Sequence, residues 1–531
     1  MRVRGLLVAA GWALSSLALG STAPTATAVR AGDIAFANSG AKAAQAPFLE
    51  GLALLHNFEY ERAASAFQRA EAADPGFAMA YWGEAMTYNH GIWMEQDLPA
   101  ARAALAKLGP TADARRTKAA SARERDYLAA VEILYGEGSK EARDFRYADA
   151  MEALHRKYPD DVDATAFYAL ALLGTCHEGR DFATYMKAAG LLEAVYPTHL
   201  RHPGVLHYLI HSYDDPIHAP LGLRPAERYG AVAPDAPHAL HMTSHIFLAL
   251  GLWDEVIAAN VNAIRVGATF TLQHSHATGG CGHYKTWLMY GELQERRDAA
   301  ALAGLLACRE TALGSLAAHK PASYDPDNSP VSSYVYMRLL QVVETGRREP
   351  AERLSWSGPG YAAPDFFDAY GDAVAALRAE DLPRLQAAAA RLAELRPPLR
   401  AQLVAEGDVA RADRESLDVI VEQMAAVARI RAGDRESGLS ALRKAAESEA
   451  AMPMEFGPPM IALPSWELLG EELLRAQQPA DAAQAFRNAL ARAPGRTRSL
   501  QGLVKSAELS GNAAAAAAAK IELARYPRGS N

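Results

Sequence analysis

Histidines and aspartates recur at a fixed spacing in the middle of this chain. Twelve of its sixteen histidines lie between His177 and His283. Three sets within this region share one constant interval between successive members: His177, His211 and His245; His207 and His241; and Asp181 and Asp215. Random scatter does not produce this density or this phase. The spacing predicts one polar group repeated at equivalent positions of successive structural units.

The segments that carry these residues have helical periodicity. Residues 203–215 and 237–250 each have an apolar face at helical spacing and polar residues on a second stripe. The polar stripes are His207, His211 and Asp215 in the first segment and His238, His241 and His245 in the second. Because packed helices lie about 8–10 Å apart, side chains from equivalent turns of neighbouring helices should meet.

The chemistry that these residue types favour is metal binding. Neutral imidazole and carboxylate groups are the usual protein ligands of Zn, Fe, Mn and Cu(II). Two histidines one helical turn apart can chelate an ion, and facing helices can hold dinuclear centres. The hypothesis is a transition-metal site. Its ligands or their hydrogen-bonded partners would be His177, Asp181, His207, His211, Asp215, His241 and His245.

The same residues also have an explanation without a metal. Histidines donate and accept hydrogen bonds and satisfy backbone carbonyls at helix interfaces, so the stripe can be a polar groove. The sequence leaves both explanations open. His56 and His90 add no independent sign of a site, and His274 and His276 are expected in a loop.

The N-terminus has the pattern of a secretory signal. Arg2 and Arg4 precede a short apolar run, and residues 26–28 read Ala-Thr-Ala, a cleavage pattern. We therefore expect a cleaved signal at residues 1–28, a periplasmic or secreted protein, and no transmembrane segment afterwards. The three cysteines, Cys176, Cys281 and Cys308, allow one disulfide in such a compartment, and Cys176 or Cys281 could instead join a metal site.

Composition and repeats define the fold class. Alanine is abundant, and the formal net charge is −8 without a basic arm, so nucleic acid is not an expected partner. Residues 466–494 contain Trp466, Leu469, Gly470, Leu473, Ala482, Phe486, Ala489 and Pro494. This pattern, and a weaker one in residues 47–75, resembles the tetratricopeptide repeat (TPR). The period of that repeat, about 34 residues, matches the interval between the histidines. The chain is identified as a TPR protein of the exported, bacterial type.

The resemblance implies an all-α fold, in which antiparallel helix pairs stack as a right-handed superhelix. The expected regions are a flexible lead-in at 29–45, a solenoid with histidine-rich central repeats at 46–319, an irregular linker at 320–364 and a C-terminal helical region at 365–531. The resemblance also implies a concave groove that binds a protein or peptide. Two functions therefore remain: an exported interaction scaffold, or a secreted metalloprotein or metalloenzyme, hydrolytic or oxidative, on that scaffold.

Overall fold

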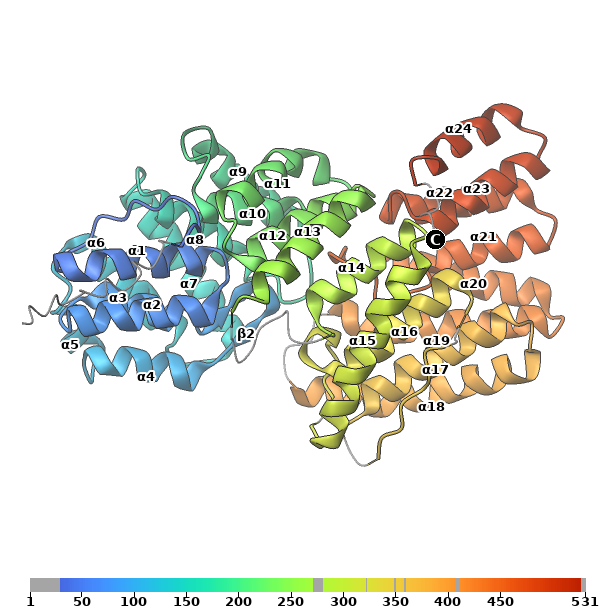
Figure 1. The fold of residues 1–531 in the computed structure, drawn as a ribbon, viewed down its shortest axis with the longest axis horizontal. Coiled ribbons are helices and arrows are strands. Elements are labelled where there is room, and N and C mark those ends of the chain that lie inside the picture. Colours follow the sequence, from blue (N-terminus) through green and yellow to red (C-terminus); the bar gives the residue numbers. More distant parts are fainter. Residues whose placement is uncertain are drawn as a thin grey trace, which may run out of the picture.

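The chain folds as an array of paired helices (Figure 1). The computed structural model describes residues 29–270, 280–320, 322–347, 350–357, 360–406 and 411–526. These residues form 24 α-helices, three short 3-10 helices and one ladder of two-residue strands. The proposed signal at 1–28 and the loop histidines His274 and His276 lie outside the described residues.

The N-terminal half contains both strands. Its elements are α1 (Lys42–His56), α2 (Tyr60–Ala73), α3 (Ala78–Met86), β1 (Asn89–His90), η1 (Gly91–Trp93), β2 (Glu95–Gln96), α4 (Leu98–Leu108), α5 (Ala112–Arg116), α6 (Ala122–Leu134), α7 (Lys140–Lys157), α8 (Val162–Leu173), α9 (Phe182–Val195), η2 (Tyr196–Thr198), α10 (Pro203–Tyr213), α11 (Ala219–Val232), α12 (Pro237–Ala249) and α13 (Trp253–Gly267). Strands β1 and β2 pair antiparallel within an irregular turn.

Among its described residues, the C-terminal half contains helices and loops but no strand. Its elements are α14 (His283–Gln294), α15 (Asp298–Ala317), η3 (Pro326–Asn328), α16 (Pro330–Thr345), α17 (Ala362–Arg378), α18 (Leu382–Glu406), α19 (Arg411–Arg431), α20 (Arg435–Ala451), α21 (Ser465–Arg475), α22 (Pro479–Arg492), α23 (Thr497–Leu509) and α24 (Ala513–Leu523). Helices that follow one another in sequence generally pack against one another. The fold is an all-α helical-repeat superhelix, which confirms the predicted class.

The repeat motif works through a phenylalanine between glycines. Phe486 on α22 is 1% exposed, and a Cβ on Gly470 or Gly502 would lie 2.8 or 2.3 Å from its ring. Phe67 on α2 has the same relation to Gly51 and Gly83, with distances of 2.9 and 2.3 Å. Only glycine lets the flanking helices approach a ring this closely. The sequence motif thus sets the spacing of the helices at both ends of the array.

Two apolar cores meet near the end of α12. One core includes buried residues from Ala31 to Ala249, and the other from Trp253 to Phe486. At the junction the Trp253 indole donates to the Gly495 carbonyl at 3.0 Å. A Cβ on Gly251, whose φ is +69°, would lie 2.5 Å from the Pro494 carbonyl oxygen. The α22–α23 turn is therefore held directly against the α12–α13 turn.

The segments that flank the helices are better packed than the sequence suggested. The expected flexible lead-in buries Ala31 and Phe36, and the Phe36 ring packs on Phe48, Trp82 and Tyr127. The expected linker at 320–364 contains α16, which buries nearly all of its residues. Because α16 is enclosed on all sides, its apolar residues do not form the single stripe of an amphipathic helix.

One described helix, α15, is long and apolar enough to cross a membrane by length and composition alone. The sequence had indicated no such segment after the signal. In the structure α15 packs against α14 and α16, and it buries Ala301, Leu305, Cys308 and Ala312. Arg309, near its centre, pairs with Glu352 at 2.9 Å. The helix is a member of the array.

Candidate metal centre

Helices α10 and α12 present the histidines. Each begins with a proline at its first turn, Pro203 or Pro237, a position where the missing N–H costs nothing. The two helices pack against each other, and every residue of α10 is buried. Their histidine stripes therefore face an enclosed interior. A peptide-binding groove would have to use other surfaces.

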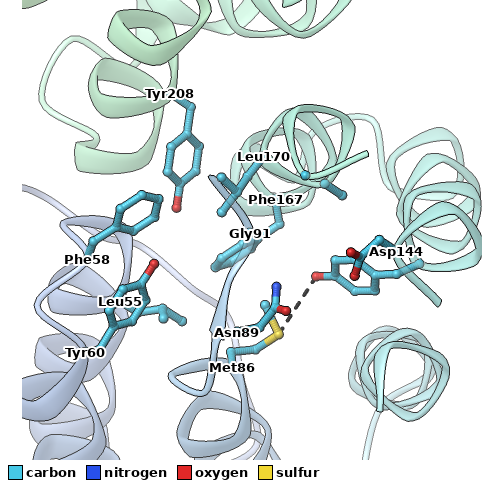
Figure 2. Close-up of a pocket in the computed structure, with 13 residues that line it drawn as sticks. Leu55, Phe58, Tyr60, Met86, Asn89, Gly91, Asp144, Phe167, Leu170 and Tyr208 are labelled. Atoms are coloured by element: carbon cyan, nitrogen blue, oxygen red, sulfur yellow. Dashed lines mark hydrogen bonds between the residues drawn. The ribbon is translucent and has the colours of Figure 1, made fainter. Parts of the chain in front are cut away.

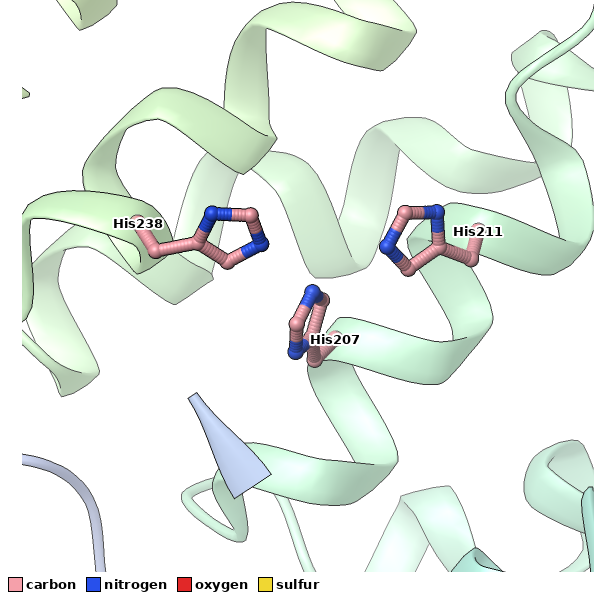
Figure 3. A group of neighbouring side chains, drawn as sticks. All are labelled: His207, His211 and His238. Atoms are coloured by element: carbon pink, nitrogen blue, oxygen red, sulfur yellow. The ribbon is translucent and has the colours of Figure 1, made fainter. Parts of the chain in front are cut away.

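Three histidines form a first triad (Figure 3). His207 and His211 from α10 and His238 from α12 each bring a ring nitrogen within 4.8 Å of the others, and all three are buried. Figure 3 shows the three rings turned towards one another from the two helices. The His207 ring centre lies 4.9 Å from that of His211 and 5.1 Å from that of His238.

Hydrogen bonds fix which nitrogen of the first triad carries a proton. His207 Nδ1 lies 2.7 Å from the His56 carbonyl oxygen, so Nδ1–H must donate and Nε2 keeps a lone pair. His211 Nδ1 lies 3.3 Å from Asp214 Oδ2, with the same consequence. Both Nε2 atoms are buried and have no hydrogen-bond partner among the described residues. Burial and the neighbouring His211 hold the pKa of His207 well below its usual range, so it stays neutral.

A second triad lies beside the first. His241 and His245 come from α12, and His283 is the first residue of α14. His241 Nε2 lies 2.8 Å from His283 Nε2 and 3.1 Å from His245 Nε2. All three side chains are buried. The three Nε2 atoms therefore converge on one point.

The Nδ1 atoms of the second triad all meet oxygen acceptors. His241 Nδ1 lies 2.7 Å from Asn260 Oδ1, and Asn260 Nδ2 donates to the Val256 carbonyl at 2.8 Å. That second bond fixes the Asn260 amide, so His241 Nδ1 must be the donor. His245 Nδ1 lies 2.9 Å from Asp214 Oδ2, and His283 Nδ1 contacts Asp327 Oδ2. Such acceptors commonly orient metal-binding imidazoles.

When the three rings are neutral and protonated at Nδ1, each turns an Nε2 lone pair towards the common point. Burial lowers the pKa of His283, but the Asp327 carboxylate outweighs this and raises it. A protonated His283 can donate to a neutral His241, and a neutral His245 then brings its own Nε2 lone pair to 3.1 Å from His241 Nε2. Burial is the main reason that the pKa of His245 falls to about 4. A cation at the common point satisfies all three nitrogens together.

Asp214 connects the two triads. Its Oδ2 accepts hydrogen bonds from His211 Nδ1 and His245 Nδ1, and its Oδ1 forms an ion pair with the Arg180 guanidinium. Burial would raise its pKa, but Arg180 and the two histidines hold the pKa of Asp214 far below the usual range. The side chain is fully buried. It therefore stays ionised and orients one ring of each triad, which makes it a positioning residue for both.

A loop from the C-terminal half covers the histidines. Arg180 Nε donates to the Met454 carbonyl at 3.3 Å, which ties residues 452–464 to the N-terminal half. The Phe456 ring centre lies 4.9 Å from that of His245 and 5.9 Å from that of His211. The Trp287 ring also stacks on that of His245, with their centres 4.5 Å apart. Aromatic rings and this loop thus help to separate the triads from bulk water.

Two of the predicted site residues lie elsewhere. His177 Nε2 is 3.0 Å from Asp144 Oδ2, and Asp181 caps α9 by accepting from the Thr184 backbone N–H at 2.9 Å. The cause is a break in the repeat spacing. The start of α12 follows that of α10 by one repeat interval, but the start of α10 follows that of α8, at Val162, by a longer interval. His177 therefore comes after the end of α8, and the structure does not bring it to His211.

The third displaced residue is Asp215. A position one helical turn after His211 would share its stripe only if the helix continued, but α10 ends at Tyr213. Asp215 instead accepts from the backbone N–H groups of Ile217 and His218, at 2.9 and 3.1 Å, and from the His218 ring. Asp214, the residue before it, turns back to the histidines.

The sequence interpretation omitted several residues of the site. His238 lies on the polar stripe of α12, and His283 follows Cys281 closely. Neither has a histidine one repeat interval before it, so the spacing argument did not include them. Asp327 comes from the Pro/Asp-rich segment before α16, and only the tertiary fold brings it to His283. Cys281 cannot act as a thiolate ligand of the triad, because it forms a disulfide with Cys308. Cys176 is a free thiol.

A third cluster shows what a metal-free arrangement looks like. His56 Nε2 and His202 Nε2 both contact Asp163 Oδ1, at 2.9 and 3.2 Å. The remaining nitrogens also have partners, since His56 Nδ1 lies 3.0 Å from the Tyr208 hydroxyl and His202 Nδ1 accepts from the Val205 N–H. Every ring nitrogen here is satisfied by protein groups. His207 and His211 differ from this network, because their Nε2 atoms have no hydrogen-bond partner among the described residues.

A small cavity lies behind the Tyr208 and Phe58 side chains. Its volume of about 20 Å³ is enough for roughly one water molecule. Figure 2 shows Tyr208, Phe58 and Tyr60 on one side of it and Asp144 on the other. This space cannot hold a substrate.

No protein-family model and no curated protein matches the sequence. Among solved structures, the chain is similar to the APC/C hetero-tetramer Cut9–Hcn1, with 11% identity over 89% of this chain and 78% of the other, and a TM-score of 0.36. It is also similar to yeast Tom70, with 12% identity over 91% and 92%, and a TM-score of 0.27. Human IFIT1, solved as a dimer with m7Gppp-AAAA, gives 12% identity over 92% and 90% and a TM-score of 0.33. These similarities concern the fold alone.

Proposed function

We propose that this protein is a metalloprotein that holds two transition-metal ions, one in each histidine triad. The observation that carries the proposal is the convergence of His241, His245 and His283 through their Nε2 atoms while each Nδ1 faces an oxygen acceptor. The Nε2 atoms of His207 and His211, which have no hydrogen-bond partner among the described residues, support the site in the first triad. Asp214 would hold the two centres in a fixed relation.

The donor set favours some metals over others. Each triad offers three imidazole nitrogens, and a carboxylate contacts Nδ1 of one ring in the first triad and of two rings in the second. Imidazole suits zinc, copper and iron, whereas manganese prefers oxygen ligands. Three histidines also leave a coordination position open, as in catalytic zinc sites. Bound there, a metal would supply Lewis acidity or electron transfer, and the described residues would orient it and exclude water.

Metal content per chain tests the proposal. Protein loaded with Zn²⁺ or Cu²⁺ and then desalted should retain two ions per chain by mass spectrometry. The Asp214→Asn variant should bind both ions more weakly, by about 10–100-fold. His319→Asn is the control, because His319 is exposed, lies outside the triads and has a φ of +53° that asparagine tolerates. Folded wild-type protein that retains no ion would refute the metal assignment.

We also propose that the protein is exported and that metal binding takes place outside the cytoplasm. The charged and apolar start of the chain supports this, and so does the Cys281–Cys308 disulfide, since such bonds persist in oxidising compartments. Mass spectrometry of the mature protein should find its N-terminus near Val29. Recovery of only the intact chain from the cytoplasm would contradict export. Binding of a protein or peptide partner stays a prediction.

A further inference from the structure

A cavity of about 180 Å³ opens beside the second triad, between α12, α22 and the 452–464 loop. Asp214 and His245 form part of its wall, so it reaches the proposed metal centre. An engineered protein cavity of about 150 Å³ is known to hold benzene. The space therefore fits a molecule with one ring and a short side chain.

Much of the wall is aromatic or apolar. Trp253, Phe456, Trp466 and Leu248 line it, together with prolines and methionines of the 452–464 loop. Trp253 and Phe456 are already held in place, the first by its bond to the Gly495 carbonyl and the second by the His245 ring. A preformed apolar wall of this kind binds the body of a small ligand.

The polar part of the wall has more acidic than basic side chains. Three carboxylates line the cavity, Asp413, Glu449 and Glu455, against one guanidinium, that of Arg492. Asp214, the fourth acid in the wall, is already paired with Arg180. Arg492 donates to the Ala450 carbonyl at 3.1 Å. The cavity wall therefore has more carboxylates that could accept hydrogen bonds from a bound cation than it has basic side chains of its own.

Two of these carboxylates have raised pKa values, chiefly because they are buried. Burial, with the nearby Asp413, raises the pKa of Glu455 to about 7, and burial raises the pKa of Asp413 to about 6. Glu449 accepts from the Ser465 N–H at 2.7 Å, and Asp413 accepts from the Tyr324 hydroxyl at 3.3 Å. A protonated amine placed among them would favour their ionised forms and would be favoured by them in return.

We propose that this cavity is the substrate-binding pocket of the metal centre and that it takes a small amine with one aromatic or apolar ring. The ring would lie between Phe456 and the tryptophans, and the ammonium group would face Glu455 and Asp413. The role of substrate pocket rests on the proposed metal function. The binding preference itself depends only on the cavity.

Calorimetric titration tests the preference with three probes of one shape. At pH 8, 2-phenylethylamine should bind at least tenfold more tightly than 2-phenylethanol, and 3-phenylpropanoate should bind more weakly than the alcohol. Glu455→Gln should weaken the amine at least tenfold. The matched Glu352→Gln variant should not, since Glu352 is exposed and pairs with Arg309 away from the cavity. Equal binding of amine and alcohol, or preference for the carboxylate, overturns the inference.

A metal-free arm separates this inference from the proposed function. The titration is repeated on protein treated with a chelator and on the His241→Ala variant. Amine selectivity in protein that never retains metal would support the cavity assignment while the metal function fails. Retention of two ions without amine selectivity would overturn the cavity assignment alone.

Discussion

The Nε2 atoms of His241 and His283 lie 2.8 Å apart, while the Nδ1 atom of each ring faces a side-chain oxygen. The two residues come from different helices and meet only in the folded chain. This arrangement predicts that the triads lose their ions separately. His283→Ala should remove the ion of the second triad and leave one ion per chain, and His238→Ala should remove the ion of the first. Metal analysis of each variant, with circular dichroism to verify folding, checks this. Loss of both ions from either variant would contradict two distinct sites.

The amide of Asn260 provides a test of how His241 is oriented. Asn260→Asp keeps an oxygen acceptor for His241 Nδ1 and should keep the second ion. Asn260→Leu removes the acceptor and should weaken binding of that ion by about 10–100-fold, while the first triad stays loaded. Competition with a chromogenic chelator measures both affinities. Equal affinity in the two variants would show that this hydrogen bond does not prepare the site.

The sequence predicted the fold because the repeat signal is local. The small residues around Phe486 and Phe67 set the approach of neighbouring helices, and both patterns are readable within about one repeat. Helix α16 was not predicted, because its burial depends on contacts that are not local in sequence. It is enclosed by neighbours that are distant in sequence, so its apolar residues show no single stripe.

The sequence predicted only some of the residues in the candidate site. His207, His211, His241 and His245 were found because α10 and α12 keep the repeat spacing. His177 and Asp215 were misplaced because a spacing argument assumes that helices begin in phase and continue, and α8 and α10 do not. Asp214, His283 and Asp327 depend on loop paths and on contacts between distant helices, which periodicity does not contain.

The packing of Phe486 gives a prediction about stability. Phe486→Ala should lower the free energy of unfolding by about 3–5 kcal/mol, because the ring is buried between helices. Gly502→Ala should lower it by about 1–3 kcal/mol, since its Cβ would lie 2.3 Å from that ring. Gly304→Ala is the control: it meets nothing within 4 Å and lies inside α15, so it should be neutral or slightly stabilising. Urea unfolding measures all three.

An ion-pair network predicts the response of the C-terminal half to acid. Burial would raise the pKa of Glu471, but Arg378 and Arg498 outweigh it and lower the pKa to about 2. Because the folded pKa is depressed, this stabilisation is present above pH 4.5 and is lost as the pH falls towards 2. It amounts to at most about 3 kcal/mol. The difference in unfolding free energy between wild type and Glu471→Gln should therefore shrink between pH 5 and 2.5. A pH-independent difference would contradict the network.

The Cys281–Cys308 disulfide anchors the chain just before His283 and predicts a link between oxidation state and metal binding. The bond closes a loop with a sequence separation of 27 residues, so its loss should cost about 3–4 kcal/mol of stability by the chain-entropy estimate. Cys281→Ser with Cys308→Ser should also weaken the second-triad ion, because Gly282 and His283 lose their tie to α15. The first triad, which uses only α10 and α12, should keep its affinity, so the change has an internal reference in the same molecule. Cys176→Ser is the matched control, since Cys176 is a free thiol. The measurement is the metal affinity of both triads under non-reducing conditions. An equal loss of affinity at both triads would indicate general unfolding. No loss at the second triad would show that α14 and Asp327 alone hold His283.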